Sequence, residues 1–232
     1  MRRLLLPLLA LALIRPAAAE AVGPDPADVR AVVDKAHEFL KSRQKPDGSF
    51  EPARGGPGTT ALIAVALVRL GKPADDPVLA KALGFLEKSV QKDGGVYNRF
   101  LANYTTSIAV LAFKEANQGG KYDKLIENAT RFLKGLQHGG PDQDLPFGGF
   151  GYDGKSRPDT SNSHFSVEAL LATLPKDDPS VKNALIFLSR CQNLPGEANK
   201  LEYAKKATEN DRGGGFRGGA GVCVKGRMGH KR

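Results

Sequence analysis

The chain has 232 residues, of which 41% are hydrophobic and 25% charged, and its formal net charge is +9. The excess positive charge belongs to the two ends, because three arginines precede residue 20 and six basic residues but no acid lie in 212–232. Residues 20–211 carry no net charge, which argues against nucleic-acid binding. Two cysteines are too few for a disulfide scaffold or a metal site of clustered thiolates.

Residues 1–19 have the features of a secretory signal peptide. Arg2-Arg3 supply the positive start, residues 4–14 form a short apolar stretch, and Ala17-Ala18-Ala19 offers a cleavage site. The apolar stretch is shorter than the roughly 20 residues that span a bilayer, although an uncleaved membrane anchor is the alternative. We therefore expect an exported protein, periplasmic or extracellular, with no stable membrane span after cleavage.

Two kinds of helix are predicted to alternate along the rest of the chain. In chain order, apolar residues recur at helical spacing in 29–40, 78–86, 125–133 and 181–188, each with one polar and one apolar face. Between them, 59–68, 105–113 and 163–171 are apolar on nearly every side, which indicates burial on all sides. The pattern therefore predicts an all-α protein, with amphipathic outer helices covering apolar inner ones. Cys191 continues the last apolar pattern, which favours a buried unpaired thiol, and pairing with Cys223 stays open.

Each outer helix ends in the same phrase of residues. Phe-Leu is followed by a glutamine, a glycine-rich loop and an aromatic residue, and the four copies begin at Phe39, Phe85, Phe132 and Phe187. The copies start 46, 47 and 55 residues apart, and self-similarity at that period indicates a repeat architecture.

This phrase resembles the glutamine–aromatic repeat of terpene cyclases, in the squalene–hopene cyclase and protein prenyltransferase superfamily. The resemblance implies an αα-toroid, here a partial α/α barrel of helical hairpins in residues 20–216. It also implies that the glutamines cap neighbouring helix ends and that the aromatic residues pack beside them. These structural residues are Gln44, Gln91, Gln137 and Gln192, with Phe50, Tyr97, Phe150 and Phe216 as their partners.

The catalytic motifs of the superfamily are not visible in this sequence. Its cyclases protonate their substrate through Asp-x-Asp-Asp, and the nearest sequence here, Asp142-Gln143-Asp144, lies between prolines typical of a turn. The chain has no Trp with which to line a carbocation cavity. The zinc ligands of the prenyltransferases are not recognisable either, since Cys223 and His230 lie in a Gly-rich tail. We expect no metal site and no cofactor.

The remaining candidate site is the start of the third inner helix. In the superfamily, functional residues often lie at the N-termini of inner helices and face the central cavity. Asp159 and His164 are candidate catalytic residues there, with Tyr104 at the equivalent place one repeat earlier. Ser161 and Asn162 are candidate ligand-binding residues. The alternative is that Asp159 or Ser161 caps the helix and that His164 is a core residue.

The repeat stops after Phe216. Residues 217–232 form a Gly/Arg-rich tail without the inner helix that the repeat requires, so we expect either a disordered extension or non-native sequence after a frame shift or early stop. On either reading the chain is a short or truncated version of the toroid.

The resemblance implies a protein that acts on or binds isoprenoid (terpenoid) ligands, with cyclisation or prenyl transfer as the reaction if it is an enzyme. A non-catalytic binding or scaffold protein is the alternative, because one fold hosts unrelated functions. A polysaccharide-processing toroid is a third class, and it would need carboxylate pairs and aromatic platforms. The expected partner is a hydrophobic isoprenoid or another protein.

Overall fold

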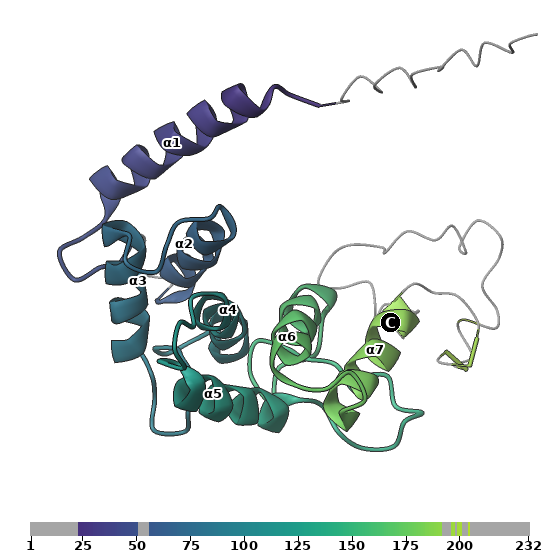
Figure 1. The fold of residues 1–232 in the computed structure, drawn as a ribbon. Coiled ribbons are helices and arrows are strands. Elements are labelled where there is room, and N and C mark those ends of the chain that lie inside the picture. Colours follow the sequence, from purple (N-terminus) through teal and green to yellow (C-terminus); the bar gives the residue numbers. More distant parts are fainter. Residues whose placement is uncertain (1–22, 51–55, 192–195, 198, 201–203, 205–232) are drawn as a thin grey trace, which may run out of the picture.

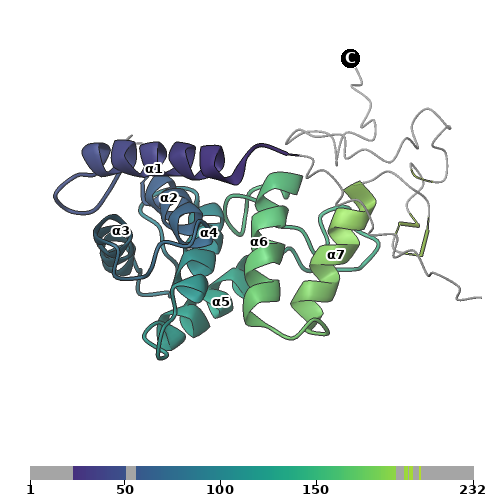
Figure 2. The same ribbon diagram turned by 45° about the horizontal axis from the view of Figure 1, so that its top comes forward.

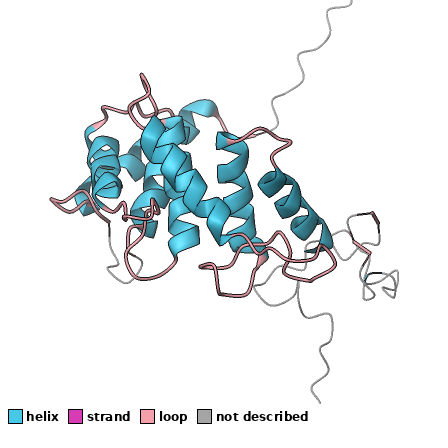
Figure 3. Cartoon of the chain, turned by 90° about the horizontal axis from the view of Figure 1, so that it is seen from below, coloured by secondary structure: helices cyan, strands magenta, loops and turns pink. Residues whose placement is uncertain are grey.

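The computed structural model describes residues 23–50, 56–191, 196, 197, 199, 200 and 204. These residues form the helices α1 (Pro26–Arg43), α2 (Gly58–Arg69), α3 (Pro77–Lys88), α4 (Ala102–Glu115), α5 (Asp123–Leu136), α6 (Thr160–Thr173) and α7 (Pro179–Cys191). Figure 3 shows helices joined by loops and no strand among the described residues, which confirms the all-α prediction. The predicted signal peptide (1–19), the tail (217–232), Gln192 and Phe216 lie outside the described residues.

The helices form two layers. In the inner layer α4 packs between α2 and α6, and in the outer layer α3 packs on α2, α5 on α4 and α7 on α6 (Figures 1 and 2). Each of these outer helices contributes an apolar stripe to the core, which α3 does with Val78, Leu79, Ala82, Leu83 and Leu86. This arrangement of hairpins is the toroid-like fold that the resemblance implies.

The three inner helices differ in burial. All residues of α4 from Thr105 to Phe113 are buried, as the apolar pattern predicted. In contrast, α2 exposes Leu62 and α6 exposes Leu171. The difference follows from position, because α4 has an inner helix on either side and the others have one described inner neighbour each. None of the described helices combines the length and the apolar character that crossing a membrane requires.

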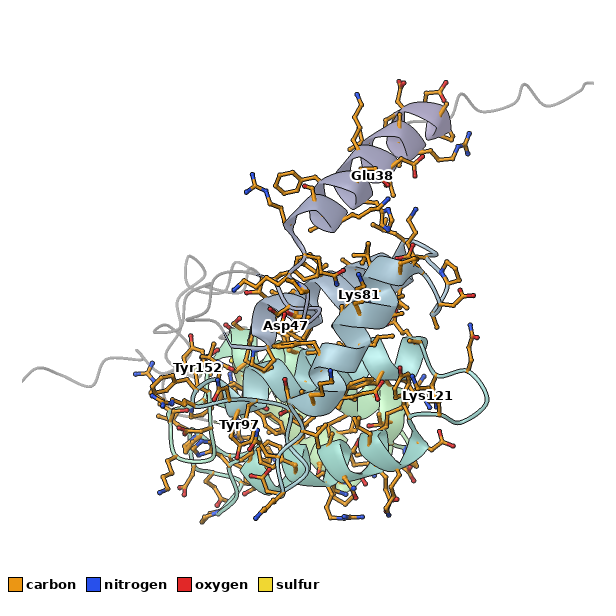
Figure 4. All side chains as sticks on the ribbon, turned by 90° about the vertical axis from the view of Figure 1, so that its left-hand side faces the viewer. Glu38, Asp47, Lys81, Tyr97, Lys121 and Tyr152 are labelled. Atoms are coloured by element: carbon orange, nitrogen blue, oxygen red, sulfur yellow. The ribbon has the colours of Figure 1, made fainter. Side chains whose placement is uncertain are left out.

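Helix α1 corrects the expectation of a packed apolar face. It projects from the body of the molecule, as the position of Glu38 in Figure 4 makes clear, and it contains no buried residue. Val29, Val32 and Phe39 are 43, 66 and 58% exposed. Every other outer helix packs on the inner helix that precedes it in the chain. No helix precedes α1 within the described residues, so its apolar stripe has no such surface to cover it.

Two of the repeat glutamines connect successive outer helices. The Gln44 side-chain N–H group donates to the carbonyl of Gly48 (3.1 Å) and to that of Val78 in α3 (2.9 Å). Gln137 repeats this arrangement with Gly148 (2.9 Å) and Ser180 in α7 (2.8 Å). They therefore contact the first turn of the next outer helix, as the resemblance implies for neighbouring helix ends.

Gln91 departs from this arrangement. Its side chain donates to the carbonyls of Ser89 (3.2 Å) and Tyr97 (2.8 Å) in its own loop. Gln91 lies six residues after Phe85, whereas Gln44 and Gln137 lie five residues after Phe39 and Phe132. Its backbone N–H donates to the carbonyl of Gly95 as that of Lys45 donates to Ser49, so Gln91 stands one residue beyond the position that contacts the next outer helix.

Val96, and not Tyr97, is the second-repeat equivalent of Phe50 and Phe150. The backbone N–H of Phe50 donates to the Thr60 hydroxyl (3.1 Å), and that of Val96 to the Thr106 hydroxyl (2.9 Å). The N–H of Phe150 donates in the same way to the hydroxyl of Ser163 (2.9 Å). The hydroxyl groups at the starts of the inner helices therefore hold the preceding loops.

Tyr97 lies at the surface of the same loop. Its ring stacks on Phe132 of α5 at 5.6 Å between centroids, and its hydroxyl donates to Asp93 at 2.6 Å. The hydrogen bond to Asp93 raises the pKa of Tyr97. Tyr97 thus helps to attach the loop to an outer helix and leaves the buried position to Val96.

One glycine in each loop lies against the backbone of the next outer helix. Gly48, Gly94 and Gly148 have φ angles of 92°, 92° and 80°, in the left-handed region that side chains disfavour. A Cβ at Gly148 would overlap the carbonyl oxygen of Asn183, and one at Gly94 would lie 2.9 Å from that of Asn128. Glycine is required here both by the backbone conformation and by the close approach.

Cys191 corrects a second expectation. It is 6% exposed, as expected, but it is disulfide-bonded and not an unpaired thiol. The other cysteine of the chain, Cys223, lies outside the described residues.

Candidate functional site

The residues predicted as a site gather at the N-terminal ends of two adjacent inner helices. Tyr104 lies in the first turn of α4, Asp159 precedes α6, and Ser161, Asn162 and His164 follow within α6. The polar members do not all face the same way, since Asn162 is buried whereas Ser161 and His164 are exposed. The structure therefore separates them into a capping pair and a surface group.

Asp159 and Asn162 form the capping pair. Asp159 is the N-cap of α6, which was the alternative to a catalytic role in the sequence analysis, and it is 5% exposed. Its two carboxylate oxygens accept from the backbone N–H of Asn162 (2.8 Å) and from the side-chain amide of Asn162 (2.7 Å). A carboxylate held by two N–H donors at a helix start has the geometry of a cap and not that of an acid presented to a substrate.

In the surface group, Tyr104 and His164 form an aromatic cluster with Phe165. The rings of Tyr104 and Phe165 meet edge to face at 5.0 Å, and His164 meets Phe165 at 5.5 Å. Burial raises the pKa of Tyr104, and the neighbouring Tyr152 adds to the effect. His164 is exposed, with 69% of its side chain accessible, so it is not the core histidine of the alternative prediction.

The sequence analysis did not single out Phe165 or Tyr152. Phe165 lies two residues after Ser163, the hydroxyl residue that holds the preceding loop. The equivalent positions of the other two inner helices, two residues after Thr60 and Thr106, are Leu62 and Ile108. Its place in the repeat was thus available as a signal, but Leu, Ile and Phe all fit an apolar pattern there. Tyr152 lies in a long loop without helical spacing, and nothing in the sequence placed it beside α4.

A buried polar network holds α4 and α6 together beneath this cluster. The Ser166 hydroxyl donates to the Asn103 side-chain oxygen (2.9 Å), and the Ser107 hydroxyl lies 3.3 Å from that of Ser166. Asn103 in turn donates from its side chain to the carbonyl of Gly151 (2.9 Å) and from its backbone to that of Tyr152 (3.0 Å). The network thereby fixes the loop that carries Tyr152 on the start of α4.

An ion cluster lies toward the other end of the inner helices. Arg69, the last residue of α2, contacts Glu115, the last residue of α4, at 2.8 Å, and Glu168 of α6 at 2.6 Å. Hydrogen bonding to Glu115, together with that to Glu168, raises the pKa of Arg69 against the effect of burial. All three side chains are between 32 and 45% exposed, so the cluster is open to solvent.

The aromatic pair and the ion cluster lie on one surface, which we call the inner face. It comprises Leu62 and Arg69 of α2, Tyr104 and Glu115 of α4, and Phe165 and Glu168 of α6. With 3.6 residues per turn, the two members on each helix lie close to the same side of it. The contacts between Tyr104 and Phe165 and between Arg69 and both glutamates join these sides across the three helices.

A groove of about 760 Å³ lies elsewhere, along the outer helix α5. Ile126 and Thr130 of α5, together with Leu174 after α6, supply much of its apolar lining, and charged residues border it. Three of those charged residues are paired with one another, since Glu127 contacts both Lys124 (2.8 Å) and Arg131 (2.6 Å). None of the predicted site residues lines this groove.

Metal-ligating side chains do not converge in the described part of the chain. No three His, Cys, Asp or Glu residues are grouped there in a way that could hold an ion. The chemistry that the arrangement can support is therefore contact with apolar groups on the aromatic rings and with charged or polar groups at the ion cluster.

Comparison with known proteins assigns a family. The family model of the squalene-hopene cyclase C-terminal domain matches residues 57–209, which is more than half of the chain. The match includes α2 to α7 and therefore the whole inner face. A search of curated proteins found no match.

Proposed function

We propose, because the chain belongs to the squalene-hopene cyclase C-terminal domain family, that it binds a hydrophobic ligand of the isoprenoid class on its inner face. The observation that carries the proposal is the Tyr104–Phe165 pair, which offers aromatic surface on the face where α2 exposes the apolar Leu62. Aromatic rings contribute large contact areas and favourable edge and face interactions to a hydrocarbon chain.

The geometry of Asp159 supports binding over cyclisation. Protonation of an alkene requires an acid that is held neutral and presented to the substrate. Asp159 is instead buried, and both of its oxygens accept from N–H groups of Asn162. We accordingly propose that the described residues bind the ligand and that Asp159 serves the structure of α6. The signal-like residues 1–19 support a further proposal, that binding takes place outside the cytoplasm.

Calorimetric titration of the full chain with farnesol, kept below its aggregation concentration, tests the proposal. The Tyr104→Ala and Phe165→Ala variants should each weaken binding by about five- to thirtyfold, as expected for loss of roughly 1–2 kcal/mol of aromatic contact. Phe39→Ala is the matched control, because Phe39 is an exposed aromatic residue of α1 and α1 contributes no residue to the inner face as defined above. Absence of farnesol binding by the wild-type chain, or equal losses in all three variants, would reject the proposal.

The exposed apolar stripe of α1 favours a second candidate function, the scaffold role. Val32 and Phe39 are 66 and 58% exposed on a helix with no buried residue, and exposed apolar surface of this kind marks interaction sites. Under this candidate, Val32→Asp would abolish assembly with a protein partner while leaving farnesol binding unchanged. Size-exclusion chromatography of the complex isolated from the source cells gives the readout, with an unaltered elution volume of the variant counting against it.

A further inference from the structure

The inner face is apolar at one end and charged at the other. Tyr104 and Phe165 form the aromatic end, whereas Arg69, Glu115 and Glu168 form the charged end. Tyr104 and Glu115 are eleven residues apart on α4, about 16 Å along its axis, whereas Phe165 and Glu168 are three residues apart on α6, about 4.5 Å along its axis. A single amphiphile with a chain no longer than an extended farnesyl group can therefore contact the aromatic rings and the charged end together.

The charged end carries an excess of negative charge. It contains one guanidinium and two carboxylates, and the guanidinium already donates to both. Glu115 and Glu168 each accept from Arg69 through the Oε1 atom. Within the described residues, the Oε2 atom of neither glutamate has a hydrogen bond. The Oε2 atom of Glu168 lies 4.0 Å from Nε2 of His164. Two carboxylate oxygens are therefore available to accept from a ligand, while the arginine is already engaged.

The helix ends favour the same sign of ligand charge. The inner helices run in parallel, since Gly58 at the start of α2 lies against Thr105 at the start of α4 and Arg69 meets Glu115 at their ends. The C-termini of α2 and α4 therefore lie side by side at the ion cluster. A helix C-terminus carries a partial negative charge that favours cations, and here two such ends add to the surplus carboxylate.

From this charge pattern, and resting on the proposed binding of a hydrophobic chain, we infer that the ligand is an amphiphile with a cationic head of the alkylammonium class. Its hydrocarbon chain lies on Leu62, Tyr104 and Phe165. Its ammonium group donates to the second carboxylate oxygens of Glu115 and Glu168. An anionic head would meet the surplus negative charge, and a hydroxyl head would gain only neutral hydrogen bonds.

Three probes with the same chain separate the head group from the hydrocarbon: farnesylamine, farnesol and farnesoic acid. Calorimetric titration of the full chain at pH 8, where imidazole side chains are neutral, should give the order farnesylamine, farnesol, farnesoic acid from tightest to weakest. The first two should differ about fivefold, the effect of one unit charge at 4 Å in water. The difference should shrink as salt is raised.

Glu168→Gln removes the surplus charge and should bring farnesylamine to the affinity of farnesol. Glu127→Gln is the matched control, because Glu127 is an arginine-paired glutamate on the outer helix α5, and its replacement should leave the order unchanged. Equal affinity of the wild type for all three probes, or the same effect of both variants, overturns the head-group inference and leaves the proposed function standing. Absence of binding by all three probes rejects the proposed function itself.

Discussion

Replacement of Gly148 by alanine tests the repeated contact between a loop glycine and the next outer helix. Gly148 has φ = 80°, and a Cβ there would overlap the carbonyl oxygen of Asn183 in α7. The left-handed conformation costs alanine about 1–2 kcal/mol, and accommodating the overlap adds about 1–3 kcal/mol. We therefore expect Gly148→Ala to lower the free energy of unfolding by about 2–5 kcal/mol, a large part of the stability of an ordinary domain.

Gly71 provides the control that separates the two costs. Its φ is 81°, but nothing lies within 4 Å of the position its Cβ would take. Gly71→Ala should therefore cost only the conformational part, about 1–2 kcal/mol. Gly94→Ala should fall between them, because its Cβ would lie 2.9 Å from the carbonyl of Asn128.

Urea unfolding followed by circular dichroism measures all three variants on the full chain. The predicted order of destabilisation is Gly148→Ala, Gly94→Ala, Gly71→Ala. If Gly148→Ala were no more destabilising than Gly71→Ala, the loop would not be pressed against α7 as described, and the reasoning from the repeat would be refuted.

Two further predictions concern other fixed contacts. Thr106→Val keeps the shape of the side chain but removes the acceptor for the buried N–H of Val96, so urea unfolding should show a loss of about 1–3 kcal/mol; an unchanged midpoint would contradict the contact. Burial acts to raise the pKa of Asp76, but hydrogen bonds from Leu79 and His37 and the charge of His37 lower it below its ordinary value of 3.8. A lowered pKa gives stability that is present above the ordinary value and lost as the pH falls through the lowered one. The wild type should therefore lose more stability than Asp76→Asn between pH 5 and pH 2.5, and parallel curves for the two proteins would contradict this.

Much of the fold could be predicted from the sequence, because each helix is indicated by the spacing of apolar residues within its own stretch of chain. Stretches 78–86 and 125–133 lie within α3 (Pro77–Lys88) and α5 (Asp123–Leu136), and the distinction between outer and inner helices follows from one-sided against all-round apolar patterns. The glycines also carried a readable signal, since a turn glycine at a fixed place in each phrase indicates a special backbone conformation.

The features that were predicted wrongly depend on which residues are neighbours in the folded structure, and a local sequence pattern does not show this. The exposure of α1 follows from the lack of a preceding inner helix among the described residues, which its amphipathic pattern does not reveal. The choice of Val96 over Tyr97 depends on which backbone N–H reaches the Thr106 hydroxyl. An aromatic residue is the more conspicuous of the two in a sequence, and the equivalent buried positions of the other repeats do hold Phe50 and Phe150.

The sequence predicted where the candidate residues lie in the fold, whereas their role as a site stays a prediction. The expected cluster does lie at the starts of α4 and α6, and Asp159 is the cap of α6. The ion cluster was missed, because Arg69 and Glu168 are 99 residues apart in the chain and only the layering of the inner helices brings them together. Charged residues near helix ends are common, so no local pattern marks this one.

Photo-crosslinking tests the central claim most directly, since it reports where an isoprenoid binds. The full chain is irradiated with a diazirine analogue of farnesol, and the labelled peptides are mapped by mass spectrometry. The account predicts labelling within α4 (Ala102–Glu115) and α6 (Thr160–Thr173), competed by free farnesol and reduced by Tyr104→Ala. Labelling confined to the groove along α5, or to α1, would contradict it.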